Sequence, residues 1–107
     1  VRVPLSRVDA VDPEEMLVAS LSSCHMLSFL YVAQRAGFSI DSYVDHAEGV
    51  MAKNEAGKMW VSKVTLKPEI AWIGDAKPTP AQIDDLHHRA HEECFIASSY
   101  KGEVVVE

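Results

Sequence analysis

Apolar residues dominate a long stretch near the start of the chain, where they occupy more than one helical face of residues 13–36. Helix-end signals bound this stretch. Asp12 is a favourable N-cap, Pro13 suits the first helical position, and Gly37 suits the residue after the last turn. The pattern predicts one long helix that is buried on most sides. A small domain offers few surfaces for such a helix, so a second copy of the chain is a reasonable source of the remaining cover.

Strand-like segments follow at residues 39–53 and 59–73, and the second of them alternates well between apolar and polar positions. The intervening residues 54–57, Asn-Glu-Ala-Gly, have the composition of a hairpin turn. Pro68 implies an edge position or a bulge, because proline cannot donate to a sheet. One face of the second segment is predicted to point to the core and comprises Trp60, Val64, Leu66, Ile70 and Trp72.

A second helix is predicted after Thr79, which forms a capping box with Gln82. Cys94 is predicted to point towards the core near the end of this helix. The apolar stripe of the helix comprises Ile83, Leu86, Ala90 and Cys94. Residues 101–107 are predicted to form a last strand and residues 1–11 an extended arm.

Together these elements predict a single α+β domain over residues 1–107, with antiparallel strand pairing. The net charge of −6 argues against a nucleic-acid partner, because phosphate binding requires clustered Lys and Arg. No uncharged, wholly apolar run reaches the length of a membrane span, and the first residues contain no export signal. We therefore expect a cytoplasmic protein with no membrane partner.

The chain contains two cysteines, Cys24 and Cys94. Lasting disulfides are rare in the cytosol, so the pair suggests inert core thiols, a metal site or a transient redox pair. Peroxide reduction would explain two separated thiols. One thiolate attacks the O–O bond and becomes a sulfenic acid, and the other thiol condenses with it to a disulfide.

Two stretches carry a family resemblance. The stretch DPEEMLVASLSSCHML, residues 12–27, resembles the first-cysteine helix of the OsmC/Ohr family, and HEECFIASSYKGEV, residues 91–104, resembles the second-cysteine motif of that family. The resemblance covers the chain from about Val11 to Val106. It implies an OsmC-like fold, with an antiparallel sheet packed on a central buried helix plus a second helix, in an intertwined homodimer that has its active sites at the subunit interface. It is also compatible with a chain that lacks the N-terminal strands of the family.

The resemblance further implies a thiol-dependent peroxidase that reduces organic hydroperoxides. By motif match Cys24 resembles the peroxidatic cysteine, Cys94 the resolving cysteine, and Glu14 the acidic residue that orients a catalytic arginine. The resemblance implies no metal or organic cofactor, and it implies an external dithiol of the lipoyl type as the reductant. Arg2 and Arg7 are the candidate arginines that precede the first motif.

Geometry constrains Glu14 and Cys24. They are ten residues apart, so a straight helix separates them by about 15 Å along its axis. An opposing helix from a partner subunit, or a break in the helix, would be needed to bring both into one site.

Several histidines and tryptophans have more than one interpretation. His25 should not share the helix face of Cys24 and is expected at the helix surface or an interface. His87 and His91 could bind a metal with Cys94, although a solvated charged face is the simpler interpretation. His91 could instead tune the Cys94 thiol. The two tryptophans, at positions 60 and 72, are expected in the core rather than in a substrate pocket.

The sequence thus supports two hypotheses of different classes. The first is a cytoplasmic, homodimeric organic hydroperoxide peroxidase that uses Cys24, Cys94 and Glu14. The second is a catalytically inactive OsmC-like binding module for an apolar ligand or partner.

Overall fold

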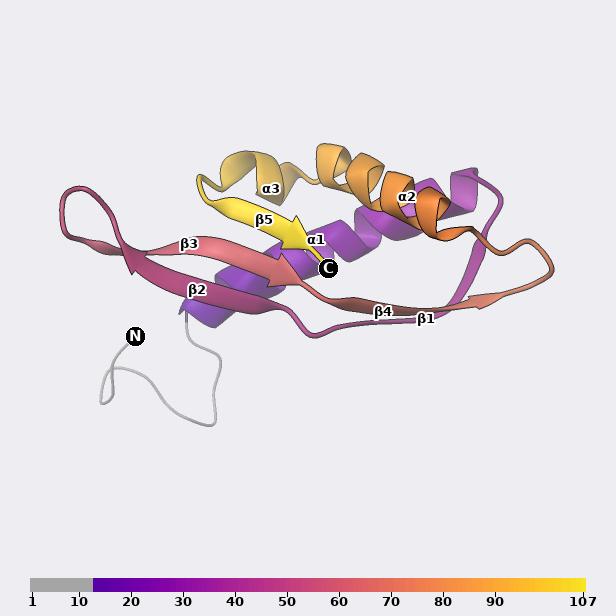
Figure 1. The fold of residues 1–107 in the computed structure, drawn as a ribbon, viewed down its shortest axis with the longest axis horizontal. Helices are drawn as coiled ribbons and strands as arrows, with labels where there is room; N and C mark the ends of the chain where they lie inside the picture. The colour runs from indigo at the N-terminus through magenta and orange to yellow at the C-terminus, as the bar shows by residue number, and fades with distance from the viewer. Residues whose placement is uncertain (1–12) are drawn as a thin grey trace.

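A long helix, α1 (Pro13–Arg35), crosses the middle of the molecule in the computed structural model, which describes residues 13–107 (Figure 1). The remaining elements follow in the order β1 (Ser39–Asp45), β2 (Glu48–Lys53), β3 (Met59–Leu66), β4 (Pro68–Ile73), α2 (Pro80–Glu93), α3 (Phe95–Ser99) and β5 (Glu103–Val106). The predicted arm over residues 1–11 and the predicted N-cap Asp12 lie outside the described residues.

The predicted helix ends are confirmed where the structure describes them. Gly37 has a φ of 90°, and its N–H donates to the Gln34 carbonyl while the Phe38 N–H donates to the Ala33 carbonyl, both at 3.0 Å. This pair of bonds is a Schellman motif, which satisfies the last carbonyls of α1. At the start of α2, Thr79 and Gln82 form the predicted capping box.

The two long strand segments form one hairpin that is divided by a corner. Beyond the turn at Asn54, β2 pairs antiparallel with β3, and on the other side of the corner β1 pairs antiparallel with β4. Asp45 fixes the corner, because its carboxylate accepts hydrogen bonds from the Lys67 N–H at 2.7 Å and from the Ser22 hydroxyl on α1. Pro68 begins β4 opposite Asp45. Within residues 13–107 β4 pairs only with β1, so Pro68 lies on an edge strand, as predicted.

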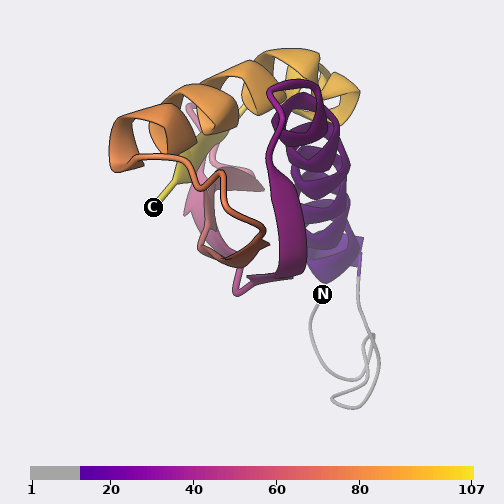
Figure 2. The same cartoon turned by 90° about the vertical axis from the view of Figure 1, so that its right-hand side faces the viewer.

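The last strand departs from the predicted antiparallel pairing. β5 is hydrogen-bonded to β3 in parallel, with Val104 opposite Val64. The chain travels from β4 through α2 and α3 before it returns, and a connection of this length allows a parallel neighbour. α2 and α3 lie together on one side of α1, and β5 brings the chain back to the sheet (Figure 2).

A register shift in the β2–β3 pair explains an error in the predicted core face. A regular strand would place Val61 and Val64 on opposite faces, because they are three residues apart. The shift between Val50 and Met51 allows both to be buried. Trp60 therefore falls out of phase and remains half-buried rather than in the core. Trp72 is also half-buried, but its ring packs against the core as predicted and lies 5.9 Å from Phe29 and 6.0 Å from Phe38.

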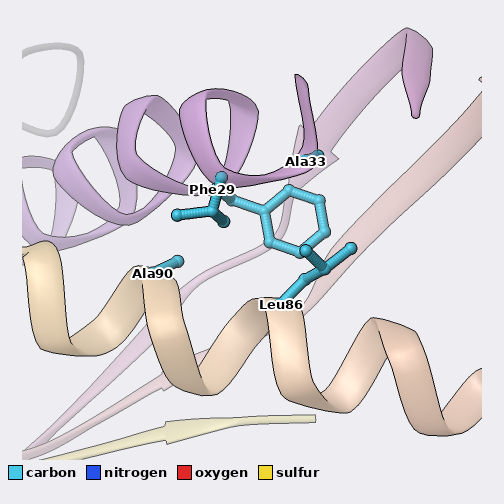
Figure 3. Packing of buried hydrophobic residues seen from close by; sticks show 5 residues of the cluster. Phe29, Ala33, Leu86 and Ala90 are labelled. Atoms are coloured by element: carbon cyan, nitrogen blue, oxygen red, sulfur yellow. The ribbon is translucent and has the colours of Figure 1, made fainter. Parts of the chain in front are cut away.

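The core consists of two separate clusters that share α1. One contains Phe29, Val32 and Ala33 of α1 with Leu86 and Ala90 of α2 (Figure 3), and β1 and β4 cover it. The other contains Leu21 of α1 with Val61, Val64 and Leu66 of β3, and β2, α3 and β5 surround it.

One side of α1 stays apolar and exposed in the single chain. Leu27 is 62% exposed, and Met16 and Tyr31 are also more than half exposed. The predicted burial of α1 on most sides therefore does not occur within one chain. The helix has the length and the mean hydropathy, 1.6, of a possible membrane span. Its packing against both core clusters explains the same composition, since the core helix of a globular domain passes the same test.

Candidate active site

Cys94 lies at the junction of two helices. It ends α2, where its N–H donates to the His91 carbonyl, and its Sγ accepts a hydrogen bond from the Ala97 N–H at 3.4 Å as the N-cap of α3. Leu86, Ala90 and Cys94 are buried along one stripe, as predicted, and Cys94 is only 1% exposed.

Cys24 lies on α1 and reaches the same junction. Its thiol lies close enough to the Cys94 side chain, to the backbone N–H groups of Phe95 and Ile96, and to the Ser28 side chain one turn along α1 for these groups to lower its pKa. Both thiols are free in the described structure. The fold therefore brings together two sulfurs that are far apart in the sequence.

The surroundings of the two thiols shift their pKa values in opposite directions. Burial raises the pKa of Cys24, but hydrogen bonds from Cys94, from the backbone of Ile96 and Phe95, and from Ser28 favour the thiolate, so the net pKa is lowered. Burial and the neighbouring Cys24 both raise the pKa of Cys94. The first proton therefore leaves Cys24, while Cys94 stays protonated and donates to it. A thiolate is the nucleophilic form of cysteine.

We expect Ser28→Ala to raise the pKa of Cys24, because the substitution removes one of its hydrogen-bond donors. The pH dependence of iodoacetamide alkylation would measure this pKa, and the reaction at neutral pH should slow by a few-fold to about tenfold. Ser28→Thr, which keeps a hydroxyl, is the matched control. An unchanged alkylation profile in Ser28→Ala would show that this hydroxyl does not stabilise the thiolate.

Glu14 does not join the two thiols in the single chain. α1 is continuous from Pro13 to Arg35, so Glu14 stays about 15 Å from Cys24 along the helix axis. Glu14 instead lines a groove of about 580 Å³ between α1 and the strands β1 and β2, together with Ser22 and Tyr43. Arg2 and Arg7, the candidate arginines, lie outside the described residues.

His25 is buried, so its predicted position at the helix surface or an interface is wrong. It is 1% exposed, and its Nε2 lies 2.9 Å from Nδ1 of His87 on α2. The sequence contained a signal for this burial, because His25 lies four residues from both Leu21 and Phe29 on the apolar stripe. Its separation from the Cys24 face was predicted correctly.

The histidines of α2 do not gather around Cys94. His87 faces His25, whereas His91 is exposed. Within residues 13–107, no group of three or more His, Cys, Asp or Glu side chains is close enough to hold a metal ion. A role for His91 in tuning Cys94 stays a prediction.

Apolar side chains flank the two sulfurs at the surface. Phe95, which follows Cys94, is 80% exposed, and Ile96 is 37% exposed. Leu27 lies three residues from Cys24 on α1 and is also exposed. Sequence reasoning did not find the Phe95 and Ile96 N–H groups, because a backbone N–H group leaves no mark in residue type. It also missed Ser28, although the spacing of four residues from Cys24 was a signal for a contact on the helix.

Comparisons with known proteins agree with this fold. An OsmC-like protein of unknown function from Vibrio cholerae is 51% identical, with a TM-score of 0.94 over 100% of this chain and 70% of that chain. An organic hydroperoxide resistance protein OsmC from Legionella pneumophila is 23% identical, with a TM-score of 0.68 over 92% of this chain and 68% of that chain.

The organic hydroperoxide resistance protein OhrB of Bacillus subtilis is 22% identical, with a TM-score of 0.72 over the same shares of the two chains. These two structures, below 25% identity, support the fold alone. No curated protein matches the sequence. The model of the OsmC-like protein family matches residues 6–107. The chain therefore belongs to the OsmC-like protein family.

Proposed function

We propose that this protein is a thiol-dependent peroxidase that reduces organic hydroperoxides. The main support is the proximity of the Cys24 and Cys94 side chains, each of which affects the pKa of the other, with the pKa of Cys24 lowered and that of Cys94 raised. Adjacent thiols of unequal acidity suit a cycle in which one attacks and the other resolves.

In the proposed cycle the Cys24 thiolate attacks the terminal oxygen of the hydroperoxide. The O–O bond breaks, the alkoxide leaves and takes a proton to become an alcohol, and Cys24 becomes a sulfenic acid. The Cys94 sulfur then attacks the Cys24 sulfur. An S–S bond forms, the S–O bond breaks, and water leaves with the Cys94 proton. An external dithiol of the lipoyl type supplies two electrons and two protons to restore both thiols.

The exposed apolar side chains at the site support the choice of substrate. The backbone of Phe95 and Ile96 lies near Cys24, and Leu27 is three residues from Cys24 on α1. All three side chains are exposed, and burial of an alkyl tail against them would stabilise the bound hydroperoxide. Relatives of this chain include proteins named for organic hydroperoxide resistance.

We propose in addition that the protein works as a homodimer in the cytoplasm. The exposed apolar face of α1, which includes Met16, Leu27 and Tyr31, is a suitable surface for a second copy. An opposing subunit is also the route by which Glu14 could approach a Cys24, since α1 holds the two apart within one chain. Two free thiols suit a reducing compartment.

A specific observation favours the second hypothesis, an inactive binding module. The groove between α1 and the strands β1 and β2 is large and mainly apolar, and neither cysteine lines it. A groove of about 580 Å³ is within the range of small-molecule sites.

Thiol counting separates the two hypotheses. The reduced protein is mixed with about one equivalent of cumene hydroperoxide, and free thiols are then titrated under denaturing conditions. The peroxidase predicts the loss of both thiols per chain, together with cumyl alcohol as product. Hydrogen peroxide at the same concentration is the matched control for the apolar tail and should react more slowly. Unchanged thiols with cumene hydroperoxide would overturn the peroxidase and favour the binding module.

A further inference from the structure

His25 is the one polar residue in the buried stripe of α1. It lies between Leu21, which belongs to the cluster on β3, and Phe29, which belongs to the cluster on α2. Desolvating an imidazole is unfavourable unless it gains a hydrogen bond. The position of His25 therefore depends on its partner.

That partner is His87 on α2. The two rings lie edge to edge in nearly parallel planes, with centroids 5.2 Å apart and planes at 11°, and Nε2 of His25 lies 2.9 Å from Nδ1 of His87. His87 also packs against Phe29, with ring centroids 4.3 Å apart. The pair therefore joins α1 to α2 at the point where the two core clusters meet.

The hydrogen bond requires a proton on one of the two facing nitrogens, which donates, and none on the other, which accepts. Nδ1 of His25 is buried and has no hydrogen-bond partner among residues 13–107. An unpaired buried donor costs more than an unpaired acceptor, so the proton of His25 is best placed on Nε2, which donates to Nδ1 of His87. The remaining N–H of His87 then has access to water, because His87 lines an open hollow beside Asp84.

This pairing is best satisfied when both rings are neutral. A proton added to Nδ1 of His87 keeps the hydrogen bond only if the proton of His25 moves from Nε2 to Nδ1, where a buried N–H has no partner among residues 13–107. A proton added to Nδ1 of His25 places a charge at the same buried position. Both changes favour separation of α2 from α1.

The pair is placed to affect the two sulfurs. His25 follows Cys24 directly on α1, and His87 precedes Cys94 on α2 by about two helical turns, on the same side of the helix. We propose that the His25–His87 pair is a positioning element: its neutral hydrogen bond holds α2 against α1 so that Cys94 stays beside Cys24, and acidification releases it and slows disulfide formation.

The charged and titratable groups around the pair agree with a neutral state at pH 7. Burial, with His87 and His91 on α2, lowers the pKa of His25 to about 4, against an opposing effect of Asp45 on β1. Burial also lowers the pKa of His87, against Asp84 on α2 and Asp45. Tyr43 on β1 is uncharged at these pH values, because burial and Asp45 raise its pKa.

The direction of the pH effect follows from these shifts. A released His25 has the ordinary pKa of 6.5 and takes up protons that the paired ring does not bind until about pH 4. The hydrogen-bonded arrangement is therefore fully favoured above pH 6.5, and it weakens as the pH falls from 6.5 towards 4.

The inference rests on the thiol pair of the proposed function but not on its peroxide chemistry, so the test uses 4,4′-dithiodipyridine. Cys24 attacks the reagent and releases one thiopyridone; Cys94 then attacks the mixed disulfide, releases the second thiopyridone and closes the bridge. The rate of the second release measures how well Cys94 is positioned. It can be followed by absorbance on the full chain from pH 7.5 to 4.5.

Two substitutions at one position separate hydrogen bonding from titration. His87→Phe keeps a ring against Phe29 but removes the acceptor, and we expect the second release to slow by about tenfold at pH 7. His87→Asn keeps an acceptor oxygen that does not titrate. We expect its second release to be nearly as fast as that of the wild type at pH 7, and to slow less than that of the wild type at acid pH. His88→Asn, at an exposed neighbouring histidine, is the control for a general effect of α2 charge.

The result that overturns the inference is a second release in His87→Phe as fast as in the wild type, or a decline at acid pH in His87→Asn identical to that of the wild type. If His87→Phe does not fold, the comparison of the wild type with His87→Asn decides alone. A wild type that releases both thiopyridones but does not react with cumene hydroperoxide would contradict the proposed function and leave this inference standing. A wild type that never releases the second thiopyridone would overturn the inference itself.

Discussion

Cys24→Ser is expected to lose hydroperoxide reduction by at least about a thousandfold, whereas Cys94→Ser is expected to react once per chain and then stop. Serine at position 24 provides no thiolate at neutral pH, so the O–O bond has no nucleophile. Serine at position 94 leaves the attacking sulfur in place but cannot form a disulfide. The sulfenic acid on Cys24 then accumulates, and intact-mass spectrometry would show one added oxygen per chain.

The two variants control for each other, because each replaces a thiol with a hydroxyl at one of the two neighbouring cysteines. Dimedone, which labels sulfenic acids, should modify Cys94→Ser after peroxide treatment and leave Cys24→Ser unlabelled. The opposite labelling pattern would mean that Cys94 attacks and Cys24 resolves. That pattern would contradict the order of acidities described for the two thiols.

Phe29→Ala is expected to reduce the free energy of unfolding by about 3–5 kcal/mol. The Phe29 ring is fully buried and lies between α1 and α2 against Leu86 and Ala90 (Figure 3). It also contacts Tyr43 and Trp72 at centroid distances of 5.8 and 5.9 Å. Removal of the ring leaves a cavity that the surrounding large side chains cannot fill, and urea denaturation followed by circular dichroism would measure the loss.

Phe95→Ala is the matched control for this stability measurement. It makes the same chemical change at a side chain that is 80% exposed, so its effect should stay within about 0.5 kcal/mol. Equal effects of the two substitutions would contradict the assignment of Phe29 to the core.

The sequence was informative where local rules decide the structure. Gly37 after α1 and the Thr79–Gln82 capping box of α2 are local signals, and the structure confirms both. The burial of Cys94 followed from the period of its helix. Its contact with Cys24 joins two distant segments, and only the family resemblance pointed to it.

The errors arose where distant parts of the chain determine the outcome. The register shift in β2 and β3 moved Trp60 out of the core face, and strict alternation cannot anticipate a bulge. The parallel pairing of β5 depends on the path of the chain through α2 and α3. His25 was placed at the helix surface or an interface because it does not share the helix face of Cys24, whereas its partner His87 lies on another helix and made burial possible.

The division of the core into two clusters has an evolutionary consequence. One cluster joins α1 to α2, β1 and β4, the other joins α1 to β2, β3 and β5, and α1 is their common member. Mutational effects at well-separated sites are nearly additive, so a change at Leu86 should rarely alter the effect of a change at Val64. Each half of the sheet can therefore diverge among homologues with little epistasis from the other half. Substitutions in α1 carry pleiotropic costs, because they disturb both halves at once.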